Sequence, residues 1–170
     1  MYCICLKRYI LIDVIVLAGF YTMRLVMGGY ATGIELSEWL IAFSMFIFLS
    51  LALLKRFTEV QRLSKEGPVY GKGRGYLATD LGVLGALGCG TACLAALVLA
   101  LYVSGQNVVI LYRYPRVLLL SCSVIFYWLG CLWLSAYRGE MGDDPVVYAL
   151  ADGRSIAAGA AVLFLVWCAT

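Results

Sequence analysis

The chain contains no histidine and few charged residues, with 13 Lys and Arg and 10 Asp and Glu making up 14% of its 170 residues. A soluble globular domain is about a quarter charged and about half apolar. This chain is 64% hydrophobic, with a mean hydropathy of +0.92. The composition therefore indicates a membrane protein. Its basic residues flank apolar runs and form no patch of their own, which argues against nucleic-acid binding.

The seven cysteines do not form the pattern of a disulfide framework or a zinc site. Cys3 and Cys5 make only a Cys-x-Cys pair. The other five lie inside apolar runs, where a thiol behaves as a small apolar side chain; they are Cys89, Cys93, Cys122, Cys131 and Cys168. A structural zinc site needs four nitrogen or sulfur ligands. Without histidine, zinc binding is not expected.

Five apolar segments stand out along the chain: Tyr9 to Gly29, Leu36 to Leu54, Leu81 to Val103, Val117 to Tyr137 and Ile156 to Ala169. A membrane-spanning helix needs about 20 apolar residues, so the last segment is short. The first segment has no small-residue cleavage pattern at its end and is interpreted as a span, not a signal peptide. The fold class predicted is an all-α polytopic membrane helix bundle of about five transmembrane helices, in one domain over residues 1–170.

Breakers and capping residues agree with this division. Gly28, Gly29 and Gly33 are expected to close the first span, and Ser37 to cap the second. In the loop before the last segment, Asp144 is placed as an N-cap and Pro145 as the first helical residue. The third span is rich in small residues, which favour close helix packing in lipid: Gly82, Gly85, Gly88, Gly90, Ala86, Ala92, Ala95 and Ala96.

The basic residues predict the orientation. One side of the predicted bundle carries ten of them: Lys7, Arg8, Lys55, Arg56, Arg62, Lys65, Lys72, Arg74, Arg138 and Arg154. The other side carries Arg113 and Arg116. Cytoplasmic loops are enriched in Lys and Arg. The expected location is therefore the inner or plasma membrane, crossed several times, with the N-terminus in the cytoplasm.

Two ionisable residues lie inside the first span. Asp13 and Arg24 are eleven residues apart, which places them about 20° from full registration on one face and about 16 Å apart along the axis. Charged groups in a span usually face a bundle interior, so this face is interpreted as lining a polar cavity or meeting partner helices. In the alternative, Arg24 snorkels to the outer surface and Asp13 pairs with a basic residue at the inner surface.

The second span ends in Lys55 and Arg56, and Lys55, Glu59 and Arg62 share one helical face. Flanking cations are expected at a membrane boundary, so spacing alone favours simple anchoring. In the functional alternative, Lys55, Arg56 and Arg62 meet phosphate oxygens and Glu59 holds Mg²⁺.

The loop 137–155 contains four acidic residues, Glu140, Asp143, Asp144 and Asp152. A cluster of carboxylates could attract a metal ion. A capped turn followed by a short interfacial helix explains the same residues without a metal, and is preferred.

Four stretches resemble the C-terminal part of the UbiA-type intramembrane prenyltransferases, most like the bacterial branch that includes decaprenyl-phosphate phosphoribosyltransferase. They are "LKRYILIDVIVLAGFYTMRLVMGGYATGIELSEWL", "FLSLALLKRFTEVQRL", "GRGY" and "YRGEMGDDPVVYALADGRS". The resemblance runs over nearly the whole chain. It implies a nine-helix bundle around a cavity, with phosphate groups and Mg²⁺ at its cytoplasmic mouth.

By the resemblance, "KRFTE" falls at the second polar motif of the family, where Lys55, Arg56 and Glu59 stand in place of aspartates. This favours a phosphate site over anchoring. Lys7 and Arg8 match a position that also faces the phosphates, and Arg24 matches a family arginine without an assigned role. The implied activity is Mg²⁺-dependent transfer between a polyprenyl phosphate, or a prenyl diphosphate, and a phosphorylated donor such as phosphoribosyl diphosphate. An aromatic acceptor is the alternative within the family.

The first acidic motif of the family, NDxxDxxxD, does not occur in the 170 residues. The five segments then correspond to the last five of nine, and the chain is expected to be weak or inactive by itself. Besides an enzyme, two other classes stay open. One is a non-catalytic membrane module, or a half that pairs with a chain carrying the missing helices. The other is a small transporter, which would predict internal repeats; none is seen.

Overall fold

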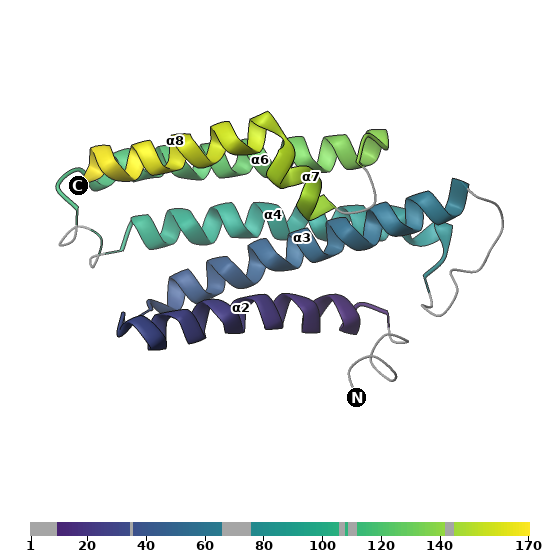
Figure 1. The fold of residues 1–170 in the computed structure, drawn as a ribbon, viewed down its shortest axis with the longest axis horizontal. Helices are drawn as coiled ribbons and strands as arrows, with labels where there is room; N and C mark the ends of the chain where they lie inside the picture. Colours follow the sequence, from purple (N-terminus) through teal and green to yellow (C-terminus); the bar gives the residue numbers. More distant parts are fainter. Residues whose placement is uncertain (1–9, 35, 66–75, 106–107, 109–111, 142–144) are drawn as a thin grey trace.

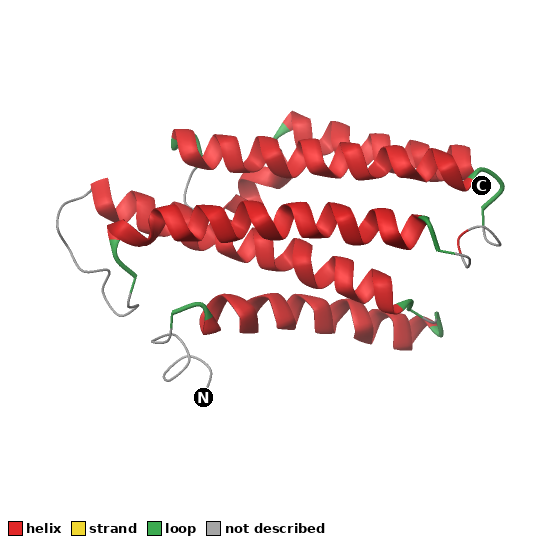
Figure 2. Ribbon diagram, turned by 180° about the vertical axis from the view of Figure 1, so that it is seen from behind, coloured by secondary structure: helices red, strands yellow, loops and turns green. Residues whose placement is uncertain are grey.

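The computed structural model describes residues 10–34, 36–65, 76–105, 108, 112–141 and 145–170. The helices in this part are α2 (Ile12–Thr32), α3 (Glu38–Lys65), α4 (Leu81–Val103), α6 (Leu119–Arg138), α7 (Pro145–Ala151) and α8 (Gly153–Ala169), with 3-10 turns η2 (Ala78–Asp80) and η3 (Pro115–Leu118). The long helices lie side by side, and successive ones run in opposite directions (Figure 1). The view from behind shows the same layered bundle, with helices throughout (Figure 2). The predicted all-α class is confirmed.

Four segments are long and apolar enough to cross a membrane, and they are Ile12–Thr32, Glu38–Ser64, Ala78–Val103 and Pro115–Arg138. The fifth predicted span is the 17-residue helix α8. At 1.5 Å per residue it is about 26 Å long, somewhat short for a hydrocarbon core of about 30 Å. The chain is therefore a helix bundle of membrane-spanning composition, with four full-length helices and a shorter fifth within the described residues.

Two helices extend beyond the predicted apolar segments. Helix α2 continues through Gly28 and Gly29 and ends at Gly33, which has a φ of 69°. Only the last of the three glycines supplies the left-handed conformation that closes a helix. Helix α3 continues eleven residues beyond Leu54, because the segment 55–65 is rich in Lys, Arg, Glu, Gln and Leu, which favour helix.

Two predicted caps can be compared with the structure. The Leu40 N–H donates to the Ser37 hydroxyl oxygen at 3.1 Å, so the predicted cap of the second helix is confirmed. Pro145 is the first residue of α7, as predicted. Asp144 lies outside the described residues.

Helix α4 packs against both α3 and α6. Its buried stripe includes Gly85, Gly88, Ala92 and Ala95. A side chain added at Gly82 or Gly90 would meet nothing within 4 Å. The predicted close packing of small residues is thus confirmed for the stripe that faces α3 and α6, whereas the described residues leave the surface at Gly82 and Gly90 open. The main core lies between α2, α3, α4 and α6 and contains Val14, Leu53, Leu54, Phe57, Leu84, Leu129, Leu132 and Trp133.

Candidate functional site

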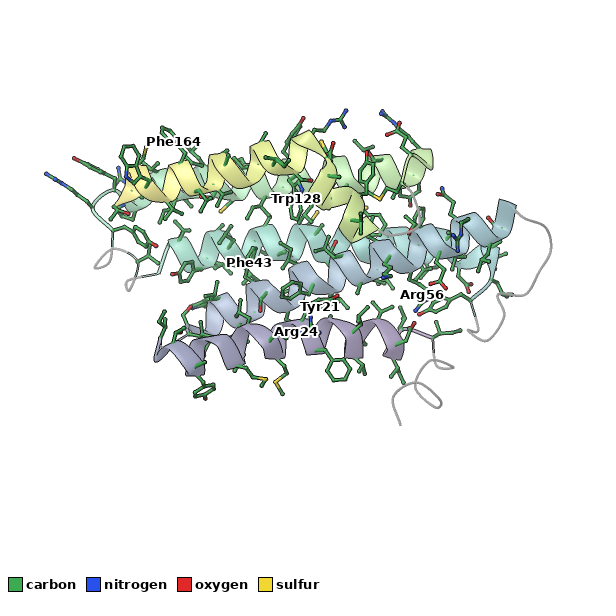
Figure 3. The ribbon with its side chains drawn as sticks, viewed as in Figure 1. Tyr21, Arg24, Phe43, Arg56, Trp128 and Phe164 are labelled. Atoms are coloured by element: carbon green, nitrogen blue, oxygen red, sulfur yellow. The ribbon has the colours of Figure 1, made fainter. Side chains whose placement is uncertain are left out.

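A cluster of polar side chains joins α2, α3 and the segment before η2. The Arg56 guanidinium donates to a carboxylate oxygen of Asp13 through Nη2 and to Glu59 through Nη1. The Tyr76 hydroxyl donates to the other oxygen of Asp13 at 2.8 Å and accepts the Leu11 N–H at 2.7 Å. We call Asp13, Arg56, Glu59 and Tyr76 the ion-pair cluster. Figure 3 shows Arg56 at the end of the bundle where α2 begins.

The cluster is buried most deeply at Asp13. The exposed fractions of the side chains are 2% for Asp13, 11% for Arg56 and 29% for Glu59. The guanidinium carbon also lies 5.2 Å from the centre of the Tyr76 ring. Because a buried carboxylate is costly unless it is paired and hydrogen-bonded, this arrangement ties the start of α2 to α3. Two carboxylates for one guanidinium give these three residues a formal charge of −1.

Leu11, directly before α2, has an unusual backbone conformation. It has a φ of 69°, which is the left-handed region that a leucine rarely adopts. That conformation costs about 1–2 kcal/mol for a residue other than glycine. The hydrogen bond from the Leu11 N–H to Tyr76 holds the residue in place. The segment before η2 therefore fixes the first turn of α2.

Burial raises the pKa of the Tyr76 hydroxyl above its ordinary value of 10.0. The hydrogen bond from the Leu11 N–H opposes this shift, and the bond to the Asp13 carboxylate reinforces it. Tyr76 is therefore the neutral hydrogen-bond donor to Asp13 at physiological pH.

The predicted site residues do not all come together. Arg56 and Glu59 join Asp13, as described. Lys55 and Arg62 are exposed on the same helix, α3. Lys7 and Arg8 lie outside the described residues. The roles assigned to these residues stay predictions.

Asp13 and Arg24 were predicted to share an inward-facing side of the first span, and only Asp13 faces inward. Asp13 is buried, whereas Arg24 is exposed on the flank of α2. The alternative in which Asp13 pairs with a basic residue at its own end of the bundle is confirmed, with Arg56 as the partner. Tyr76 was not singled out from the sequence. Its only signal there was its place in the "GRGY" stretch, directly after a glycine-rich connection.

The acidic loop gives no cluster in the described part of the chain. Glu140 lies 3.9 Å from Arg138, with both side chains about half exposed or more. Asp152 precedes α8 without a side-chain cap bond. Asp143 and Asp144 lie outside the described residues.

The described residues do not fit a Mg²⁺ site of their own. No group of three or more potential ligands from Asp, Glu, His and Cys occurs among them. Both oxygens of Asp13 already accept hydrogen bonds, and Glu59 is bonded to Arg56. Mg²⁺ requires oxygen ligands in near-octahedral geometry. At most, Glu59 could add one ligand to a metal held mainly by other groups.

Two curated proteins match nearly the whole chain. It is 36% identical over 158 residues to a protein of Sinorhizobium fredii called uncharacterized protein y4nM, covering 92% of this chain and 31% of that protein. It is 34% identical over 169 residues to nodulation protein NoeC of Azorhizobium caulinodans, covering 95% of this chain and 53% of that protein. The chain thus spans about a third and about half of these relatives. No family model and no solved structure matches it.

Proposed function

We propose that the chain is the membrane-embedded part of a transferase acting between a polyprenyl phosphate and a phosphorylated donor such as phosphoribosyl diphosphate. The observation that carries the proposal is the extension of α3. This helix continues nine residues past Arg56, about 14 Å at 1.5 Å per residue. It thereby extends beyond the start of α2 (Figure 1). Lys55 and Arg62 are exposed along it.

The position of these cations suits a lipid phosphate. The apolar chain of a polyprenyl phosphate lies in the hydrocarbon region, so its phosphate lies at the membrane surface. Lysine is a point-charge phosphate binder, and arginine binds phosphate in a two-pronged manner. Lys55 and Arg62 would bind the phosphate oxygens and stabilise the charge that develops on a leaving diphosphate. The resemblance of the stretch 48–63 to the second polar motif of the UbiA-type family supports the same assignment.

Arg56 has a different role in this proposal from that predicted from sequence. Its guanidinium is already engaged by Asp13 and Glu59, so it positions the helix face that carries Lys55. Lys7 and Arg8 would add further cations. Mg²⁺, if the reaction uses it, would be held mainly by groups outside the described residues, and no step is assigned to it.

The distribution of basic residues supports a cytoplasmic location for this end. Arg62 near the end of α3 and Arg138 at the end of α6 lie at the same end of the bundle as the start of α2, whereas Arg113 and Arg116, before α6, lie at the other end (Figure 1). Arg154 lies nearer mid-length, since the neighbouring Ser155 accepts a hydrogen bond from Trp128 in the middle of α6. Under the positive-inside rule the phosphate-binding end faces the cytoplasm of a multi-pass protein in the inner or plasma membrane.

Binding of radiolabelled phosphoribosyl diphosphate to the chain in lipid vesicles containing a polyprenyl phosphate tests the proposal. Lys55→Met and Arg62→Met should each weaken binding about tenfold, equivalent to about 1.4 kcal/mol. The control Arg113→Met, at the other end, should leave binding unchanged. Unfolding in denaturant should be the same for all variants. The proposal fails if the wild-type chain binds no donor, or if the three variants bind equally well; a non-catalytic membrane module would then be favoured.

A further inference from the structure

Arg24 lies deep within a helix that is long enough to cross a membrane. It is the thirteenth of the 21 residues of α2, about 12 Å from the helix end at Thr32 and about 18 Å from the start. Its side chain is exposed. Among the described residues, none of the ion pairs includes Arg24.

The guanidinium of Arg24 is directed toward the middle of the helix. Its Cζ lies 5.2 Å from the centre of the Tyr21 ring, and that ring stacks on Phe48 of α3 at a centroid distance of 5.4 Å. Figure 3 shows Tyr21 and Arg24 together at mid-length of the bundle. Side chains of a helix lean toward its N-terminus, here away from the nearer end. This is the opposite of the snorkelling that carries a lipid-facing arginine to water.

Lipid is a poor environment for this group. An arginine at the centre of a transmembrane helix is among the most costly side chains to insert. A cation–π contact at an exposed site is weaker than this cost. The contact with Tyr21 therefore compensates only part of the cost, and an anion at the same depth would supply the rest.

The residues around Arg24 suit a helix contact. Phe20, Met27 and Gly28 lie on the same stripe of α2 at spacings of three or four residues, and all three are exposed. A side chain at Gly28 would meet nothing within 4 Å. Small residues let neighbouring helices approach closely in a membrane. We call Phe20, Arg24, Met27 and Gly28 the Arg24 face.

We propose that the Arg24 face docks a membrane-spanning helix from outside this chain that presents an aspartate or glutamate to Arg24. This interface goes beyond the proposed reaction and does not depend on it. Both curated relatives are longer than this chain, which spans 31% and 53% of them, so they contain further segments in which such a helix could occur.

Two other occupants fit less well. Phosphate groups of lipids lie about 15 Å from the bilayer centre, beyond a hydrocarbon core of about 30 Å, whereas the guanidinium is directed inward. Among the described residues, a second copy of this chain offers no suitable carboxylate at that depth. Two acidic residues lie inside the predicted apolar segments, Asp13 and Glu38. Asp13 is bonded to Arg56 and Tyr76, and Glu38 is the first residue of α3, at the end of its span.

Photo-crosslinking in native membranes tests this interface on the full chain. A photoreactive phenylalanine replaces Phe20, or, as a control, Leu163 on α8, which is 72% exposed. The adduct at residue 20 should contain a peptide from an apolar helix of another segment with an Asp or Glu. Arg24→Gln and Arg24→Glu should lower its yield about tenfold, and Arg24→Lys should retain it. Changing the partner's carboxylate to lysine should restore the yield in the Arg24→Glu variant.

Several results would overturn the interface. They are adducts with lipid only, adducts with a second copy of this chain, no adduct at residue 20, or a crosslinking yield at residue 20 that does not change with the charge at residue 24. Unfolding in denaturant of the Arg24→Gln variant should match the wild type, since Arg24 is exposed; a loss of folding would itself contradict the assignment of Arg24 to an external contact. None of these results bears on donor binding at Lys55, so the two proposals can fail separately.

Discussion

The indole ring of Trp133 on α6 occupies the space that a side chain at Gly88 on α4 would need. A Cβ atom at residue 88 would lie 1.9 Å from Cζ2 of Trp133. The indole N–H donates to the Ser50 hydroxyl at 3.1 Å, and that hydroxyl donates to the Gly88 carbonyl at 2.9 Å. Three helices therefore meet at one point, and the absence of a side chain at residue 88 makes the contact possible.

Gly88→Ala should destabilise the bundle by about 1–3 kcal/mol, because overpacking forces the Trp133 ring or the backbone to move. Gly90→Ala is the matched control, since a Cβ there meets nothing within 4 Å. Unfolding of the two variants in mixed detergent micelles gives the comparison. Equal effects of the two substitutions would show that α4 and α6 do not approach each other at Gly88.

Asp13→Asn should destabilise the chain by about 3–5 kcal/mol, because it leaves the charge of Arg56 mostly buried beside a weaker partner. The double variant Asp13→Leu, Arg56→Met should lose less, since the charge that it deprives of Arg56, on Glu59, is 29% exposed and reaches water. The matched control is Glu140→Gln, whose pair with Arg138 is exposed on both sides and is worth about 0–1 kcal/mol. A similar loss for Asp13→Asn and Glu140→Gln would contradict the burial of the ion-pair cluster.

Tyr76 should make the stability of the chain depend on pH in the alkaline range. Its pKa is raised in the folded chain, mainly by burial. Its contribution is therefore complete below its unfolded pKa of 10.0, and is lost as pH rises through the folded pKa. Tyr76→Phe should be less stable than wild type at neutral pH, and the difference should shrink above about pH 10. A constant difference over that range would show that the Tyr76 hydroxyl does not bind Asp13 in its neutral form.

Topology reporters should place the two ends of the bundle on opposite sides of the membrane. Alkaline phosphatase fused after Gly105, between α4 and η3, should be active outside the cytoplasm. The same enzyme fused after Gly139, at the end of α6, should be inactive because it stays in the cytoplasm. The reverse pattern would contradict both the orientation and the cytoplasmic position of Lys55 and Arg62.

Much of the fold follows from local patterns. The apolar runs that end at Val103 and near Arg138 correspond to α4 and α6 because a membrane requires every backbone group to be bonded within the segment. Ser37 and Pro145 mark helix starts through their own side-chain chemistry. The expectation failed at Gly28 and Gly29, because a glycine can continue a helix as well as end one. Beyond Leu54, the continuation of α3 agrees with the shared helical face predicted for Lys55, Glu59 and Arg62.

The candidate site could be predicted from the sequence only in part. The periodicity of α2 relates Asp13 to Arg24, and that of α3 relates Lys55 to Glu59, but neither pattern relates Asp13 to Arg56. These two residues are 43 positions apart and meet because antiparallel helices bring the start of α2 beside α3. Tyr76 joins them after a further connection, and no local spacing indicates it.

Composition and hydrophobic length by themselves determined that this chain is a bundle of membrane-spanning helices, since each such helix satisfies its own backbone and needs no partner to be recognised. Only the tertiary structure decided which charges neutralise one another, because ion pairs depend on distances between helices that are far apart along the chain. The tertiary structure buries Asp13 against Arg56 and leaves the side chain of Arg24 exposed. Two charges of the same helix face thus have opposite surroundings.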